Sequence, residues 1–403
     1  MSAAANVSSW DPRLPAPAAG DLAHCVACGL CLPHCPTYRL TGRETASPRG
    51  RIAAMRAVDE GRAEVDGAFR YMMDECLACR ACEAACPSGV PFGRMVEAAR
   101  AQAEPGRDPR SRALRRAGLA WLLPRRRLLV AMAAGLGASQ ALGLDRLVPR
   151  RLAGAAPRVS LRELRRPLPR AQGRGPTAAL LTGCVMDVAF RPVHRATLRA
   201  LARSGWRAVV PGGGGCCGAL SMHHGYPEAA RRMARDRIPE LEGADVVVVN
   251  SAGCSAHMRT WGELLADDPA WAERAHRVAE RVRDVADMPF ATEPRRLGAV
   301  AVHDACHHLH AQGIGATPRA MLRAVGAEVV EVADAGRCCG AVGLYSVLEP
   351  DFSSELRAQK ARAIAATGAP VVAVANPGCA LQIAAGLRDI GSLICVAHLV
   401  ELI

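Results

Sequence analysis

Aromatic side chains are scarce in this sequence of 403 residues, where they account for 3% of the positions. Lysine is almost absent, since Lys360 is the only one, and arginine carries nearly all of the positive charge. The sequence has no complete G-x-G-x-x-G fingerprint behind an expected strand and no G-x-x-x-x-G-K-[ST] loop. These absences argue against the usual dinucleotide and phosphate sites, so we expect this chain to bind neither flavin nor nicotinamide.

The N-terminus also lacks an apolar leader, because residues 1–20 are small, polar and rich in proline. We therefore expect no signal peptide and a cytoplasmic location. Disulfide frameworks are rare in that reducing compartment, yet the sequence contains 17 cysteines. Thiols in such number are better interpreted as metal ligands.

The formal net charge of +13 is compatible with nucleic acid, an anionic membrane surface or an acidic partner. Arginine is concentrated in residues 107–174, where a solvated basic connector would account for it without any partner. We expect no nucleic-acid partner.

Two copies of one cysteine motif lie near the N-terminus, each with the spacing C-x2-C-x2-C-x3-C and each followed by proline. This is the run of bacterial ferredoxins, in which the fourth cysteine of each run binds the other cluster. Zinc sites usually show separated cysteine pairs instead. We therefore predict two [4Fe–4S] clusters, the first on Cys25, Cys28, Cys31 and Cys86 and the second on Cys76, Cys79, Cys82 and Cys35.

Helical periodicity surrounds these motifs. Ile52, Met55 and Val58 recur every three residues between them, and the segment from Pro87 to Ala99 follows a helical pattern as well. We predict a helical, ferredoxin-like two-cluster domain over residues 1–104.

Residues 105–175 form a basic connector rich in proline and arginine, which we predict to be helical. Within it, residues 128–144 are mostly apolar but contain several glycines and polar residues. A membrane-spanning helix needs about 20 apolar residues. A helix packed on the core and an interfacial helix on an anionic membrane are the other two interpretations, and the extent of membrane contact by residues 113–147 stays open.

The last nine cysteines contain a second repeat, in which a single cysteine is followed by a Cys-Cys-Gly sequence and then by another single cysteine. In both copies 32 residues separate the first cysteine from the pair. The first copy uses Cys184, Cys216, Cys217 and Cys254, and the second uses Cys306, Cys338, Cys339 and Cys379.

Short apolar runs precede four of these cysteines and are typical of buried parallel strands; they are residues 178–182, 246–249, 300–302 and 371–374. Amphipathic helical stretches lie between the runs. We therefore predict an α+β protein overall, in which the helical domain is followed by two similar α/β lobes with parallel sheets, over residues 176–290 and 291–403. Open α/β sheets place their ligand sites at the carboxyl ends of strands, where these cysteines lie.

Four thiols converging in each lobe have three interpretations: an additional metal or cluster site, dithiol/disulfide chemistry, or buried structural cysteines. Nearby histidines are candidates for ligands, proton donors or hydrogen-bond partners of ligands; they are His223, His224, His303, His307, His308 and His310. Cys395 stands outside the repeat in an apolar run, and we expect it to be a core residue.

The two ferredoxin motifs followed by two Cys-Cys-Gly repeats resemble the iron–sulfur subunit of glycolate oxidase over nearly the whole chain. Related subunits occur in anaerobic glycerol-3-phosphate dehydrogenase and heterodisulfide reductase. The segments 211–220 and 303–308 look most like the glycolate oxidase branch. The resemblance implies a hetero-oligomer in which flavin-containing subunits oxidise glycolate or another 2-hydroxy acid.

In that family the iron–sulfur subunit passes electrons onward, towards quinone or another membrane acceptor. The resemblance thus implies a subunit of an oxidoreductase acting on CH–OH groups, peripheral on the inner face of the plasma membrane, that does not oxidise glycolate alone. Fuller versions of the repeat end in C-x-x-C, whereas Ser251 and Asn376 stand at the first of these positions here. That departure argues against the alternative function, a heterodisulfide reductase-like thiol/disulfide reductase that uses the Cys-Cys-Gly lobes.

Overall fold

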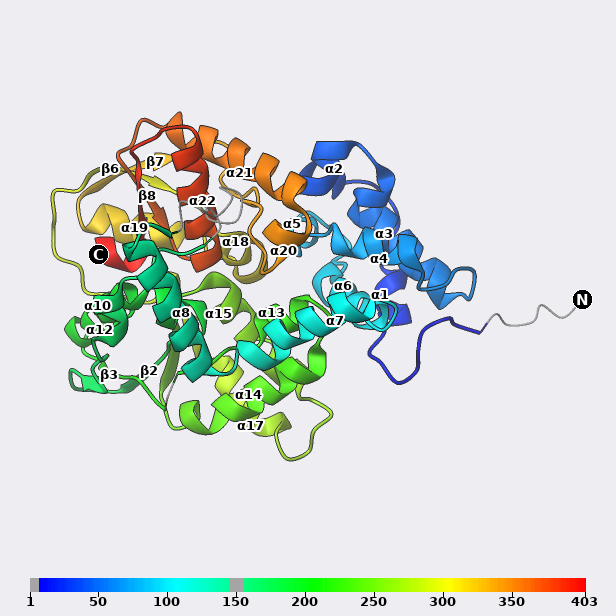
Figure 1. The fold of residues 1–403 in the computed structure, drawn as a ribbon, viewed down its shortest axis with the longest axis horizontal. Coiled ribbons are helices and arrows are strands. Elements are labelled where there is room, and N and C mark those ends of the chain that lie inside the picture. Colours follow the sequence, from blue (N-terminus) through cyan, green and yellow to red (C-terminus); the bar gives the residue numbers. More distant parts are fainter. Residues whose placement is uncertain (1–6, 145–155, 213) are drawn as a thin grey trace, which may run out of the picture.

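The computed structural model describes residues 7–144, 156–212 and 214–403. Residues 145–155 of the predicted connector and Gly213 lie outside the described residues. In Figure 1 the N-terminal helices lie at one end of the long axis, and two α/β lobes lie side by side at the other.

The N-terminal part is helical, as predicted. Its elements are α1 (Ala19–Ala23), η1 (Leu32–His34), α2 (Pro36–Thr41), η2 (Glu44–Ala46), α3 (Pro48–Asp59), α4 (Gly67–Asp74), α5 (Ala81–Ala84) and α6 (Phe92–Ala103). The Ser47 hydroxyl caps α3 by accepting from the Gly50 N–H, and the Asp66 carboxylate caps α4 by accepting from the Phe69 N–H. The apolar faces of α3, α4 and α6 meet in one core, which includes the predicted Ile52, Met55 and Val58.

The connector contains α7 (Pro109–Arg116), the π-helical turn η3 (Ala117–Leu122), α8 (Arg126–Ala141) and α10 (Leu161–Arg165). Ala133 and Gly137 are the buried residues of helix α8. The helix therefore packs against the first lobe through a narrow part of its surface. A Cβ atom at Gly137 would lie 3.0 Å from the Val159 carbonyl oxygen, so glycine permits this close approach. Among the described residues, no helix combines the length and apolar character needed to cross a membrane.

The first lobe contains a five-stranded sheet in the order β1-β3-β2-β4-β5, with only β1 antiparallel. Its strands are β1 (Ala171–Gln172), β2 (Thr177–Leu181), β3 (Arg207–Val209), β4 (Val246–Val249) and β5 (Val282–Asp284). Its helices are α11 (Val185–Ala189), α12 (Arg191–Arg203), α13 (Ala219–His223), α14 (Pro227–Leu241), α15 (Ala252–Met258), α16 (Trp261–Leu264) and α17 (Ala272–Arg281). All four valines of β4 are buried, because the two faces of the sheet pack into two hydrophobic clusters.

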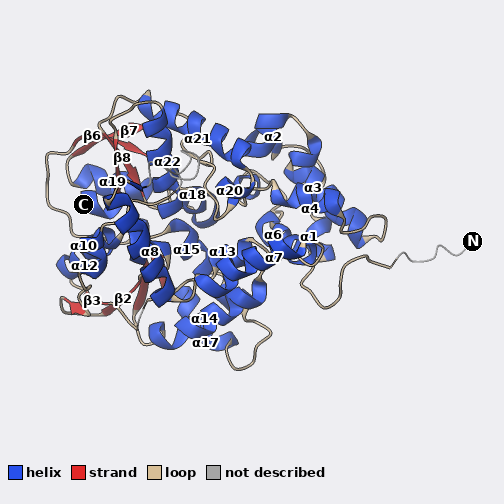
Figure 2. Ribbon diagram, in the orientation of Figure 1, coloured by secondary structure: helices blue, strands red, loops and turns tan. Residues whose placement is uncertain are grey.

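The second lobe repeats this plan with a four-stranded parallel sheet in the order β7-β6-β8-β9. Its strands are β6 (Gly298–Val302), β7 (Ala327–Glu331), β8 (Val371–Val374) and β9 (Cys395–His398). Its helices are α18 (Cys306–Gln312), α19 (Ala316–Ala324), α20 (Tyr345–Leu348), α21 (Pro350–Ala365), α22 (Pro377–Asp389) and α23 (Leu399–Leu402). Figure 2 shows the two sets of strands apart from each other, each enclosed by helices.

The two lobes share one hydrophobic core. Alternate side chains of β2, such as Leu180, pack into the same cluster as Val300 and Val302 of β6, while the other faces of the two sheets pack against separate helices. The predicted fold class is therefore confirmed, and the shared core explains why the two lobes lie face to face rather than as independent units.

Candidate metal centres

The two ferredoxin-type motifs form loops with the same backbone conformation. Ala27 and Ala78 hold equivalent places in the two motifs, with φ of 57° and 47°. Gly29 and Arg80, two residues further on, also have positive φ, at 85° and 61°. Residues other than glycine seldom adopt a positive φ. Such backbone conformations cluster at active sites and ligand-binding loops.

Each loop encloses a cavity lined by sulfur. The first cavity is lined by Cys25, Cys28, Cys31 and Cys86, together with Cys82. The second cavity is lined by Cys35, Cys76, Cys79 and Cys82. The structure thus groups the thiols as the two predicted ligand sets do, and the assignment of individual ligands stays a prediction.

The chemistry of these thiols fits iron–sulfur clusters. Burial raises the pKa values of Cys79 and Cys82 well above the ordinary thiol value, so thiolates there need a positive charge to compensate them. Bound iron would supply that charge, and thiolate is the ligand that [4Fe–4S] clusters use. In the second loop the Ala78 N–H donates to Cys76 Sγ at 3.3 Å, which is the kind of contact that stabilises ligating sulfur.

The two cavities differ in their surroundings. The first opens beside exposed Cys28, where Val26 and Leu30 are 71% and 56% exposed. The second faces the second lobe, since Cys79 and Cys306 belong to one apolar cluster. The Tyr345 hydroxyl donates to the Glu75 carbonyl at 2.9 Å across the same boundary.

The eight repeat cysteines converge as predicted, four in each lobe. In the first lobe Cys184 and Cys217 both contact Cys216 and lower its pKa well below the thiol value, while Cys217 also contacts Cys254. In the second lobe, contact with Cys338 lowers the pKa of Cys306, and contacts with Cys338, Cys379 and His303 lower that of Cys339. None of the seventeen cysteines, all of which lie in the described part of the chain, forms a disulfide.

A cavity of about 230 Å³ lies between the lobes and is lined by cysteines of both. The lobes meet at its edge, where Ser251 Oγ donates to Asn376 Oδ1 at 3.3 Å and the Gly253 N–H donates to the same oxygen at 3.3 Å. Positions that hold a thiol in fuller versions of the repeat therefore bond to each other here.

Two of the six candidate histidines line this cavity, His223 and His307. His223 Nδ1 lies 2.6 Å from the carboxylate of Glu97 on α6, and this contact lowers the pKa of Glu97 although burial opposes the shift. The Cys306 thiolate raises the pKa of His307 against the effect of burial. Sequence reasoning missed Glu97, because one acid within a helical pattern gives no signal.

Three other histidines have partners away from the thiols. His308 Nε2 lies 2.9 Å from Asp284, His310 Nε2 lies 3.0 Å from the Gly336 carbonyl, and buried His224 lies near the Leu344 N–H. None of these three contacts involves sulfur.

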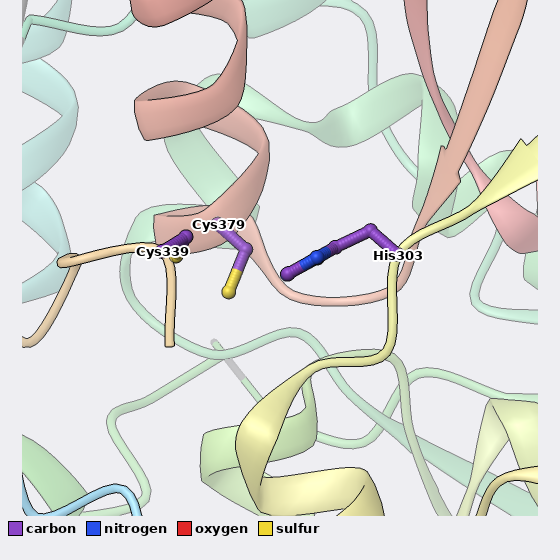
Figure 3. Close-up of side chains that lie close together, drawn as sticks. All are labelled: His303, Cys339 and Cys379. Carbon is purple, nitrogen blue, oxygen red and sulfur yellow. The ribbon is translucent and has the colours of Figure 1, made fainter. Parts of the chain in front are cut away.

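His303 differs from the others because its ring approaches two thiols. Its ligand nitrogen and the sulfur atoms of Cys339 and Cys379 lie within 4.8 Å of one another, and all three side chains are buried. Figure 3 shows the imidazole pointing from the end of β6 towards Cys379 at the start of α22.

The expectation that Cys395 is a core residue is wrong, because its side chain is exposed. It begins β9, which forms an edge of the second sheet, and its neighbour Leu393 is 99% exposed. An apolar run at a sheet edge buries only part of its residues, which periodicity alone does not reveal.

Comparison with known proteins matches residues 21–90 to a family model described as a 4Fe-4S dicluster domain. Residues 178–259 and 300–384 both match a model described as a cysteine-rich domain.

Among similar proteins, the probable glycolate oxidase iron-sulfur subunit of Bacillus subtilis (strain 168) is 34% identical, over 95% of this chain and 94% of that protein. The glycolate oxidase iron-sulfur subunit of Escherichia coli (strain K12) is 30% identical, over 94% of this chain and 92% of that protein. Lactate utilization protein A of Shouchella clausii (strain KSM-K16) is 29% identical over 56% of this chain and 97% of its own length.

Proposed function

Because the chain belongs to the family of glycolate oxidase iron–sulfur subunits, we propose that it transfers electrons from flavin-containing subunits of a 2-hydroxy acid oxidase towards a quinone. The observation that carries this proposal is the pair of adjacent cysteine-lined cavities in the N-terminal part, which share Cys82. Two [4Fe–4S] clusters held there supply one-electron redox chemistry.

The positions of the two sets of cysteines support a direction for the proposed electron transfer. Cys28, Val26 and Leu30 bring the first set of thiols to the surface, where an electron-donating subunit can approach closely. Cys79 brings the second set against Cys306, and hence against the lobes. The flavin-containing partner is therefore proposed to dock at the first loop, with the acceptor on the side of the lobes.

Contact with a membrane surface is proposed for the connector. Exposed apolar side chains cluster there, and they are Leu114, Trp121, Leu128, Met132, Leu142 and Leu144. Arginines accompany them, and the Arg125 guanidinium lies 4.1 Å from the centroid of the Trp121 ring. Apolar side chains flanked by arginine suit an anionic lipid surface, which supports peripheral attachment on the cytoplasmic side.

The lobes are proposed to take part in electron transfer through their thiols. A further metal centre bound by those thiols is one way to do so. The thiol/disulfide reductase alternative is less favoured. Ser251 and Asn376, which replace two of its thiols, bond to each other across the lobe boundary.

Substitution Cys79→Ala tests the proposal. We expect the purified complex to lose about half of its iron and acid-labile sulfide, because one of two [4Fe–4S] clusters goes. Quinone-linked oxidation of the 2-hydroxy acid should be abolished, while reduction of a dye at the flavin subunits continues. Iron and sulfide analysis, electron paramagnetic resonance and the two activity assays measure these outcomes.

The matched control is Cys395→Ala, which removes an exposed thiol at a sheet edge and should leave iron content and both activities unchanged. Loss of dye reduction in correctly assembled Cys79→Ala complex would refute the proposed division of labour between this chain and its partners.

A further inference from the structure

The two lobes repeat the same layout of cysteines but differ in one donor. Each lobe has a buried residue three positions before its first cysteine: Leu181 before Cys184, and His303 before Cys306. At this one position, therefore, the second lobe has an imidazole and the first lobe has an aliphatic side chain. No comparable group of three donors occurs elsewhere in the described part of the chain.

Three separate loops deliver the donors to one point. His303 follows β6, Cys339 lies in the loop after β7, and Cys379 lies in the first turn of α22 after β8. Their donor atoms lie within 4.8 Å of one another, a spacing that one ion can bridge, since zinc–sulfur and zinc–nitrogen bonds are about 2.3 and 2.0 Å long.

The imidazole of His303 is buried beside sulfur. His303 is 4% exposed, and neither of its ring nitrogens bonds to a nitrogen or oxygen atom of the described residues. A buried polar group without such a partner is costly, and the sulfur atoms of Cys339 and Cys379 lie close to this one. An ion bound to the nitrogen would remove that cost.

The surroundings are those of an anionic metal site. The Asn376 side chain donates to Cys379 Sγ at 3.5 Å, as groups that orient metal ligands do. Buried Lys360 donates to the carbonyl oxygens of Asp334 and Ala335 and places its positive charge near the thiols of this lobe.

We propose that the second lobe binds a single divalent transition-metal ion through His303, Cys339 and Cys379, and that the first lobe does not. Two thiolates and one imidazole are the donors that zinc prefers, and a three-residue set leaves a fourth coordination position open. The ion is distinct from the two clusters of the N-terminal part, and the proposal does not depend on the direction of electron transfer.

The test compares four forms of the full chain, purified anaerobically: wild type, His303→Leu, His303→Cys and His310→Leu. His303→Leu gives the second lobe the leucine that the first lobe has, and His303→Cys keeps a soft donor. His310→Leu is the control, since His310 bonds only to a backbone carbonyl. Zinc, iron and sulfide are measured per chain, and zinc affinity is measured by competition with a chromophoric chelator.

We expect about one zinc per chain in wild type, His303→Cys and His310→Leu, and at least a tenfold weaker affinity in His303→Leu. Iron should stay at about eight atoms per chain in all four forms, since two [4Fe–4S] clusters account for it. Unchanged zinc affinity in His303→Leu would overturn the proposal. So would four additional irons with matching sulfide in the wild type, which would indicate a third cluster. Rescue by His303→Cys separates loss of a ligand from loss of the fold.

Discussion

Arg100 joins the second ferredoxin-type loop to the first lobe, and its removal should loosen that junction. The side chain is 4% exposed, and its guanidinium donates to three backbone carbonyl oxygens. These belong to Met73 at 2.8 Å, to Cys76 at 2.5 Å and to His223 at 2.7 Å. Met73 lies just before the loop of the second cavity, and Cys76 is part of that loop. His223 is the last residue of α13 in the first lobe.

Substitution Arg100→Met keeps the apolar stem and deletes the donors. The buried carbonyls of Cys76 and His223 then lose their donor, whereas the Met73 carbonyl still accepts from the Cys76 N–H at 3.3 Å. A buried acceptor without its partner costs about 1–3 kcal/mol, so the free energy of unfolding should fall by roughly 4 kcal/mol after partial relaxation. For a chain of this length that loss corresponds to a melting temperature lower by about 5 °C. The midpoint potential of the second cluster should also become more negative, because a cation beside a ligand loop is lost.

Differential scanning fluorimetry and redox titration, both under anaerobic conditions, measure the two effects. Arg94→Met is the matched control on the same helix, since Arg94 is exposed and forms its ion pair with Asp21 of α1, within the N-terminal part. A free-energy change of 1 kcal/mol corresponds to about 1 °C in melting temperature for this chain. If the melting temperatures of the Arg100→Met and Arg94→Met variants differed by less than about 1–2 °C, the bonds of Arg100 to the carbonyls would not hold the domains together.

Two further predictions concern the connector and the buried histidines. The double substitution Trp121→Glu with Met132→Glu should weaken co-sedimentation with anionic vesicles at least about tenfold, because two exposed apolar anchors are lost. Leu393→Glu is the control, and equal weakening by it would contradict a specific membrane face. Burial lowers the pKa of both His194 and His224 to about 3, against an ordinary value of 6.5. The unfolded chain binds more protons between these values, so stability is complete above pH 6.5 and should fall by about 2 kcal/mol per ring by pH 5. A melting temperature that is constant from pH 7 to 5 would refute this.

The sequence predicted the strands whose signal is local. The apolar runs of β2, β4, β6 and β8 are continuous and lie just before cysteines, and all four are strands. By contrast β3, β5, β7 and β9 are short or carry charged residues, as in Arg207–Val209 and Ala327–Glu331. Such segments become strands because a neighbour in the sheet pairs with them, which a sequence pattern does not report.

The residues of the candidate site were likewise predictable only where their signal is local. Spacing alone indicated the eight cysteines of the ferredoxin-type motifs, because one loop contributes most of each set. It could not single out His303 among six candidate histidines, or place Glu97 beside His223, since these contacts join distant parts of the chain. The error at Cys395 has the same origin, because an edge position depends on strand order.

The bond between Ser251 and Asn376 has a consequence for how this repeat can evolve. The fuller motif needs cysteine at both positions, and either change alone removes this bond, which is one of several between the lobes. It would also leave the Gly253 N–H without its acceptor if Asn376 changed first. Each single step is thus unfavourable before any ligand is gained, so the two positions are constrained to change together.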